Sequence, residues 1–287
     1  MPGNCLSRFL FLDLNRRWFH HKSYVPLLIN NLMRSKNLIL FIAVFSFLFS
    51  FTSCEKETEE FETEAIADYM PLTVGKYITY RLDSTVFTNF GKNTEIHKYQ
   101  VKHVVDIQTT DNLGRPSYRI LRFPRDSAGT QPWLENGTYF ITPLSDQAEV
   151  IEDNLRFIKL HLPFKLNTDW KGNKHLAHDP FGSVATFFND DDMNEWDYNM
   201  ENYESVANIG GQSVNDVYTI FQIDEANNAP VTNINVLGWR TLATEKYAKN
   251  IGLVSRDFIM WEYQPKPGGG AGFTAGFGIK MWMIDHN

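Results

Sequence analysis

From residue 68 to the C-terminus, apolar and polar residues alternate with a period of two, and no segment keeps the period of an amphipathic helix. The alternation is regular in 78–83, and in 97–109 it is interrupted by His103. Residues 256–263 are apolar on both faces near the middle of the segment, which is typical of a strand with a neighbour on each side. The pattern therefore predicts β-strands, with 256–263 in a central position.

Clusters of Gly, Asn, Asp and Pro separate the predicted strands at short intervals. Ten or more antiparallel strands at such spacing predict an all-β domain, built as a curved sheet, a half-barrel or a sandwich. The glycine run 268–270 follows two prolines, and we expect it to form an exposed loop between the last two strands. The turn clusters lie at 89–93, 111–114, 135–137, 210–211 and 225–230.

A different pattern precedes the predicted domain. After Met33 come two basic residues, an apolar stretch of about 14 residues within 37–51, and then Thr-Ser and Cys54. This stretch is shorter than the roughly 20 apolar residues of a transmembrane helix. Residues 33–54 resemble a bacterial lipoprotein signal, although Phe51 stands where that pattern prefers an aliphatic residue. An uncleaved N-terminal membrane anchor is the alternative.

The resemblance to a lipoprotein signal has consequences for the mature chain. It implies that 33–53 is removed as a signal peptide, that the Cys54 thiol carries a diacylglyceryl group, and that the new N-terminus is acylated, for example with palmitate. Residues 1–32 do not fit in front of a signal peptide, and we interpret them as an erroneous extension of the gene. The lipid anchor at Cys54 predicts an outer-membrane location.

Residues 54–67 are predicted to form a flexible acidic tether, because six of the ten residues after Cys54 are acids that repel one another. In some Gram-negative groups, an acidic stretch directly after the lipidated cysteine resembles an export tag for surface-exposed lipoproteins. A plain spacer is the alternative. The periplasmic and the cell-surface faces of the outer membrane therefore both stay open.

Charge and cysteine content narrow the function classes. The first 53 residues hold six basic side chains and one acid, which leaves 21 basic and 33 acidic side chains, a net charge of about −12, for 54–287. Phosphate groups repel so acidic a domain, so we expect no nucleic-acid partner. The two cysteines are Cys5 and Cys54, so the mature domain has no disulfide and no cysteine metal ligand.

The remaining residues, 68–287, are predicted to form a single β-rich domain. Within it, 69–80, 250–256 and 278–282 resemble a group of secreted lipoproteins of Gram-negative bacteria, which have a PLxxGxxWxY strand near the start and a GIGLV strand near the end. The resemblance brings no substrate with it. By analogy, the long antiparallel strands are similar to the half-barrel of periplasmic lipoprotein carriers.

One acidic segment has the spacing of a metal site. Asp190, Asp192, Asn194 and Glu201 occupy places one, three, five and twelve of an EF-hand loop, and their oxygen atoms suit Ca²⁺. However, the sharply turning sixth place, normally Gly, is Glu195, and the flanking residues alternate as strands do. We therefore favour a solvated acidic turn and keep the four residues as candidate metal ligands.

No catalytic or cofactor motif is present, so we expect no cofactor and no enzyme activity. The many Trp and Tyr residues predict either a concave binding surface or simply a core. We interpret the chain as a non-catalytic binding or carrier module for an apolar or glycan ligand that the sequence does not name. The alternatives are an assembly lipoprotein that docks a protein partner and, less favoured, a glycan hydrolase, whose two carboxylates need no local motif.

Overall fold

The computed structural model describes residues 64–183 and 188–287, which form an all-β domain. Twelve strands make one antiparallel sheet, and two short helices accompany them in the described part, α2 (Ile66–Tyr69) and the 3-10 helix η1 (Met193–Glu195). This confirms the all-β prediction made from the period-two alternation. The strands are β1 (Tyr77–Thr88), β2 (Asn93–Thr110), β3 (Pro116–Asp126), β4 (Thr138–Pro143), β5 (Gln147–Glu152), β6 (Leu155–His161), β7 (Asp169–Trp170), β8 (Tyr198–Ile209), β9 (Gln212–Asn227), β10 (Gly238–Ala248), β11 (Gly252–Gln264) and β12 (Phe273–His286).

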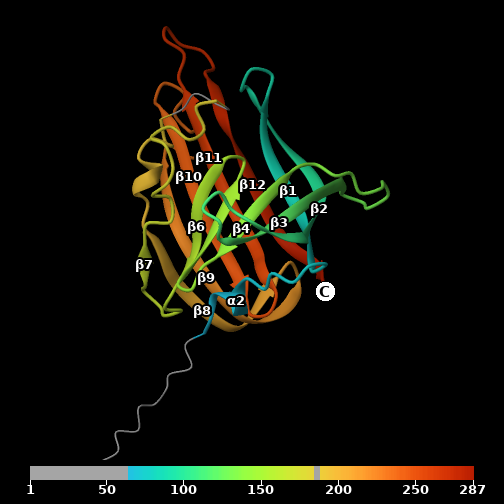
Figure 1. Ribbon diagram of the computed structural model, residues 1–287. Helices are drawn as coiled ribbons and strands as arrows, with labels where there is room; N and C mark the ends of the chain where they lie inside the picture. The colour runs from blue at the N-terminus through green and yellow to red at the C-terminus, as the bar shows by residue number, and fades with distance from the viewer. Residues whose placement is uncertain (1–63, 184–187) are drawn as a thin grey trace, which may run out of the picture. The chain divides into compact units, whose positions relative to one another are not determined.

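The strand order explains the shape of this domain. Most strands pair with their neighbours in sequence, and β1 also pairs with β12, so the sheet runs from β6 to β1 and then from β12 to β7. Figure 1 shows the two halves curving around a shared interior. At the two edges, the Ile158 amide donates to the Gly172 carbonyl at 2.7 Å, and the Trp170 indole donates to the Ile158 carbonyl at 2.8 Å. The sheet is therefore a nearly closed barrel.

Details of the strands follow the sequence pattern with one exception. β11 lies between β10 and β12, which confirms the central position predicted for 256–263. The glycine run 268–270 lies in an exposed loop between β11 and β12, as expected. His103, however, does not interrupt the buried face of β2 but belongs to it, with 9% of its surface exposed. The pairing of β2 with β3 skips Asp106, and this bulge turns Ile107 outward.

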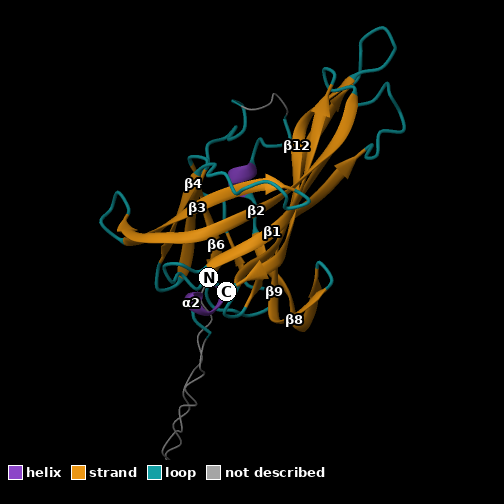
Figure 2. Cartoon of the chain, turned by 90° about the vertical axis from the view of Figure 1, so that its right-hand side faces the viewer, coloured by secondary structure: helices purple, strands orange, loops and turns teal. Residues whose placement is uncertain are grey.

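One end of the barrel is covered by α2, as Figure 2 shows. Tyr69 is fully buried, and its ring centroid lies 4.6 Å from that of Phe164 and 5.2 Å from that of Tyr218. Ile66 is buried as well, so 64–67, the described part of the predicted tether, packs against the domain. In the described residues, no helix has the length and apolar character needed to cross a membrane.

Candidate functional site

Five charged side chains from five strands meet inside the barrel, and we call them the charge cluster: Arg122 of β3, Glu152 of β5, Lys159 of β6, Glu245 of β10 and Arg256 of β11. Lys159 Nζ lies 2.9 Å from Glu245 Oε1, and Arg256 Nη1 lies 3.0 Å from Glu152 Oε2. Each of these ion pairs joins one half of the sheet to the other. The charge cluster therefore crosses the barrel interior.

Local strand geometry positions the cluster. The pairing between β5 and β6 skips Lys159, because Ile158 and Leu160 pair with consecutive residues of β5. Such a bulge re-aims a side chain and is frequent beside functional sites. Glu245 and Arg256 lie directly opposite each other on β10 and β11, where opposite charges attract across a ladder.

Burial and ion pairing decide the charge states in the cluster. Burial alone would raise the pKa of Glu152, but the guanidinium groups of Arg256 and Arg122 lower it to about 2. Burial likewise opposes ionisation of Glu245, whose pKa is nevertheless held below its ordinary value by Lys159 and Arg256. Burial lowers the pKa of Lys159, and the nearby Glu245 carboxylate offsets part of that effect. Both glutamates are therefore ionised at neutral pH.

A cavity of about 140 Å³ adjoins the charge cluster, and all five cluster members line it. Phenylalanines form its apolar wall, and we call it the phenylalanine cavity. The rings of Phe258 and Phe277 stack with centroids 5.7 Å apart. Phe181, from the segment between β7 and β8, packs edge-on against Phe277 at 5.2 Å, and Phe157 of β6 lines the same space. The cavity thus has an apolar side and a charged side.

Two side chains that line this cavity each have a buried hydrogen-bond donor without a partner. Nε of Arg122 and Nε2 of Gln222 are buried and make no hydrogen bond to any described residue. Gln222 is 5% exposed, and it is also a bulge residue, because Phe221 and Ile223 pair with consecutive residues of β10. A buried donor without an acceptor costs about 1 to 3 kcal/mol. Six more buried polar atoms in the described residues also lack a partner, but of the eight only these two belong to side chains that line this cavity.

A smaller cavity of about 80 Å³ lies between the charge cluster and the residues that follow α2, and we call it the helix-side cavity. Arg256 lines both cavities, so the charge cluster separates them. The helix-side cavity is mostly apolar, with Met70 and Leu72 among its lining residues. His103 also lines it, and burial lowers the pKa of this imidazole to about 3. Its Nδ1 lies 3.1 Å from the Tyr139 hydroxyl.

The structure does not bring the four candidate calcium ligands together. Asp190 is fully buried, and its Oδ2 accepts a hydrogen bond from the Phe181 amide at 3.1 Å. Asp192 points outward with 83% of its side chain exposed, Asn194 Nδ2 donates to Glu195 Oε1, and Glu201 is exposed on β8. Among residues 64–183 and 188–287, no three His, Cys, Asp or Glu side chains are grouped so that they could hold a metal ion.

Asp190 has a different property that the sequence pattern did not predict. Burial, together with the neighbouring Asp179 carboxyl, raises its pKa to about 6. A short turn and η1, rather than an EF-hand loop, follow Asp190 and lead into β8, which begins at Tyr198. This carboxyl pair belongs to the segment between β7 and β8.

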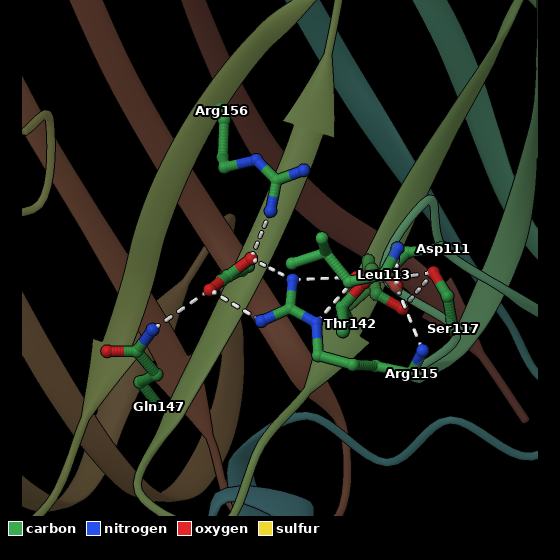
Figure 3. Close-up of polar contacts among 9 residues, drawn as sticks. Asp111, Leu113, Arg115, Ser117, Thr142, Gln147 and Arg156 are labelled. Carbon is green, nitrogen blue, oxygen red and sulfur yellow. Dashed lines mark hydrogen bonds and ion pairs between the residues drawn. The ribbon is translucent and has the colours of Figure 1, made fainter. Parts of the chain in front are cut away.

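A second group of charges, which we call the Glu149 cluster, lies on the other face of β5 and is shown in Figure 3. Glu149 is 4% exposed. Its carboxylate accepts hydrogen bonds from Arg115 at 2.8 Å, from Arg156 at 2.5 Å and from Gln147 at 3.0 Å. Arg115 also pairs with Asp111. None of the four polar side chains around Glu149 has a buried atom without a partner in the described part of the chain.

Sequence reasoning missed the charge cluster, although one signal pointed to it. The alternation in β11 places Arg256 on the same face as Phe258 and Met260. A charge on the apolar face of a central strand must be paired or reach water. The predicted lipidation site Cys54, the signal peptide 33–53 and the extension 1–32 lie outside the described residues.

Comparison with known proteins identifies no relative. The chain matches no protein-family model and no curated protein. A mutant of the porin of Rh. blastica aligns with 74% of this chain and 99% of its own length, at 11% sequence identity and a TM-score of 0.22. That TM-score is too low to transfer the porin's fold or function to this chain.

Proposed function

We propose that the chain is a lipid-anchored envelope protein whose barrel binds a small ligand in the phenylalanine cavity without converting it. The observation that carries this proposal is the cavity itself, about 140 Å³ inside a nearly closed barrel, with phenylalanines on one side and the charge cluster on the other. Small-molecule sites typically combine apolar walls with a few fixed polar groups, and barrels commonly house them.

The charge states favour binding over glycan hydrolysis at this site. A glycoside hydrolase needs one carboxyl that is still protonated near neutral pH to act as the general acid. Three carboxylates line the cavity, and Asp153 is the exposed one. The two buried ones, Glu152 and Glu245, both have pKa values below the ordinary value, because cationic partners outweigh the effect of burial. Both are therefore ionised at pH 7 and do not supply the general acid, which supports a non-catalytic module.

The membrane part of the proposal rests on the sequence around Cys54. The thioether-linked lipid would hold the barrel at the outer membrane through the acidic residues that follow. In cells, Cys54→Ser should move the protein from the membrane fraction to the soluble fraction and remove the mass of the acyl groups. Thr58→Ser, four residues after Cys54 in the acidic stretch, serves as the matched control. An unchanged mass and location for Cys54→Ser would contradict the anchor.

Ligand binding can be tested without knowing the ligand. The full chain, purified from its own membranes in detergent, is examined by native mass spectrometry for a bound small molecule. Ile279→Trp places a large ring in the phenylalanine cavity, which Ile279 lines. We expect this variant to lose the bound mass.

The matched control blocks the other cavity. Ile251→Trp fills the helix-side cavity, which Ile251 lines and the phenylalanine cavity does not share. It should retain the bound mass. A small molecule that stays bound in Ile279→Trp, or the absence of any bound small molecule in the unmodified protein, would contradict the proposed site.

A further inference from the structure

We propose that the ligand of the phenylalanine cavity is a monocarboxylate with a compact apolar body, an inference that rests on the binding function proposed above. The head group would accept hydrogen bonds from Arg122 and Gln222, and the body would lie against the phenylalanine wall. Three independent features of the cavity lead to this chemistry.

The first feature is the direction of the missing hydrogen bonds. Arg122 and Gln222 both line the cavity, and the buried unpartnered atom of each, Nε and Nε2, is a donor. No cavity-lining side chain of the described chain has a buried acceptor without a partner. The missing group must therefore offer acceptors, and a carboxylate offers two oxygens with no hydrogen to place. Charged acceptors also form the stronger hydrogen bonds.

The second feature is the charge balance of the cavity. The charge cluster contains three cationic side chains but two carboxylates, so it is short of one negative charge. Asp153 also lines the cavity and contacts Arg122, at 2.9 Å, but its side chain is 69% exposed and water screens its charge. A buried charge is stable when it is paired. A ligand with one negative charge would therefore complete the pairing.

The third feature is the size and character of the apolar wall. The mutually packed rings of Phe181, Phe258 and Phe277 face a space of about 140 Å³. This is close to the roughly 150 Å³ of an engineered apolar cavity that admits benzene. An aromatic ring or a chain of about six carbons therefore fits. Phosphate esters and sugars, which need many more polar partners, do not match this wall.

Isothermal titration calorimetry on the full chain in detergent at pH 7 tests the inference. Three probes share one carbon skeleton and differ in charge: phenylacetate is an anion, 2-phenylethanol is neutral and 2-phenylethylamine is a cation. Phenylacetate should bind at least 10-fold more tightly than 2-phenylethanol, and 2-phenylethylamine should not bind. Hexanoate is then tested as a competitor of phenylacetate. Competition favours an aliphatic acid as the natural ligand, and its absence favours an aromatic acid. Both outcomes agree with a carboxylate.

Matched variants place the binding in the cavity. Gln222→Met keeps the side-chain size and removes the donor, and it should weaken phenylacetate binding by about 10-fold to 100-fold. Gln131→Met changes an exposed glutamine in the loop after β3 and should leave the Kd unchanged. Ile279→Trp keeps every charge and should abolish binding, which keeps the test decisive should Gln222→Met fold poorly.

The outcomes separate this inference from the proposed function. If the amine or the alcohol binds tightly, and Ile279→Trp abolishes that binding, the carboxylate class is wrong but the binding function stands. The same holds for a small molecule found by native mass spectrometry when no acid probe binds. If no probe binds and no bound molecule is found, both the ligand class and the binding function fall. An unchanged Kd in Gln222→Met would overturn the assigned head-group site.

Discussion

Two groups of charged residues in this barrel have similar chemistry but are completed in different ways. In the Glu149 cluster, one carboxylate receives hydrogen bonds from two arginines and a glutamine, and every buried polar atom of these residues has a partner. In the charge cluster, Arg122 keeps an unpartnered donor, and a cavity lies beside it. Burial of charge alone therefore does not mark a ligand site.

The Glu149 cluster and the charge cluster differ in which parts of the fold they connect. A buried ion pair gains little net stability over apolar packing, because desolvation offsets the attraction between the charges. The Glu149 cluster joins β5 to its neighbour β6 and to Arg115 in the turn before β3. The charge cluster joins distant strands across the barrel and leaves two cavities at its sides. We therefore propose a structural role for the Glu149 cluster and keep the proposed ligand-binding role for the charge cluster.

Removing the central carboxylate of the Glu149 cluster should have the largest effect. Glu149→Ala leaves Arg156 without its ion-pair partner, which costs about 3 to 5 kcal/mol for a buried pair. Urea denaturation should show this loss of unfolding free energy, while the affinity for phenylacetate stays unchanged. The exposed Glu135→Ala is the control and should lie within about 0.5 kcal/mol of the unmodified protein. A weaker ligand affinity in Glu149→Ala at unchanged stability would break the division of roles.

The barrel interior around His103 and the Glu149 cluster should also lower the unfolding free energy at different pH values. Burial lowers the pKa of His103 to about 3, so the folded protein keeps this imidazole neutral while the unfolded chain binds a proton below pH 6.5. Unfolding free energy should therefore fall as the pH drops from 6.5 to 5, by at most about 1.4 kcal/mol per pH unit from this residue. Glu149, whose pKa the arginines hold below its ordinary value despite burial, contributes nothing in this window.

Urea denaturation at pH 7 and pH 5 measures this difference. His103→Gln should make the stability less dependent on pH, because the group that gains a proton on unfolding is gone. His286→Gln, at an exposed position near the C-terminus, is the matched control. An equal pH dependence in the two variants would show that the buried imidazole does not set the acid response of the interior.

The alternation of apolar and polar residues predicted the strands well, because each strand has an inner face that excludes water. It placed β11 centrally and located the loop before β12, since both depend on local sequence alone. The near closure of the barrel depends on two contacts. One is the pairing of β1 with β12, which lie far apart in the sequence, and the other is the hydrogen bond between Ile158 and Gly172 at the two edges of the sheet. No local pattern encodes such pairings.

The sequence did not predict the candidate site for two reasons, its long-range pairings and its bulges. Lys159 and Glu245 are 86 residues apart, so their ion pair cannot be read from spacing. In addition, Lys159 and Gln222 face the cavity at bulges, and one extra residue in a strand leaves no trace in composition. The acidic segment from Asp190 had the stronger local signal, but strand β8 carries Glu201 outward and the calcium pattern is not assembled.

The smallest effect on stability, with a large effect on binding, is expected for Lys159→Met. Glu245 keeps Arg256 at 2.8 Å and the Tyr247 hydroxyl at 2.9 Å as donors, so no carboxylate is left unpaired. Nζ of Lys159 lies 4.5 Å from the centroid of the Phe157 ring, and the methionine side chain would pack against this ring instead. The unfolding free energy should change by about 1 kcal/mol or less, in contrast to Glu149→Ala.

The same variant should weaken phenylacetate binding by at least about 10-fold, because the cavity loses the cation that leaves the cluster one negative charge short. Lys165→Met, at an exposed lysine beyond the end of β6, should change neither quantity. Calorimetry and urea denaturation on the three proteins give both values. A large loss of stability in Lys159→Met with unchanged affinity would mean that the charge cluster, like the Glu149 cluster, serves only to hold the strands together.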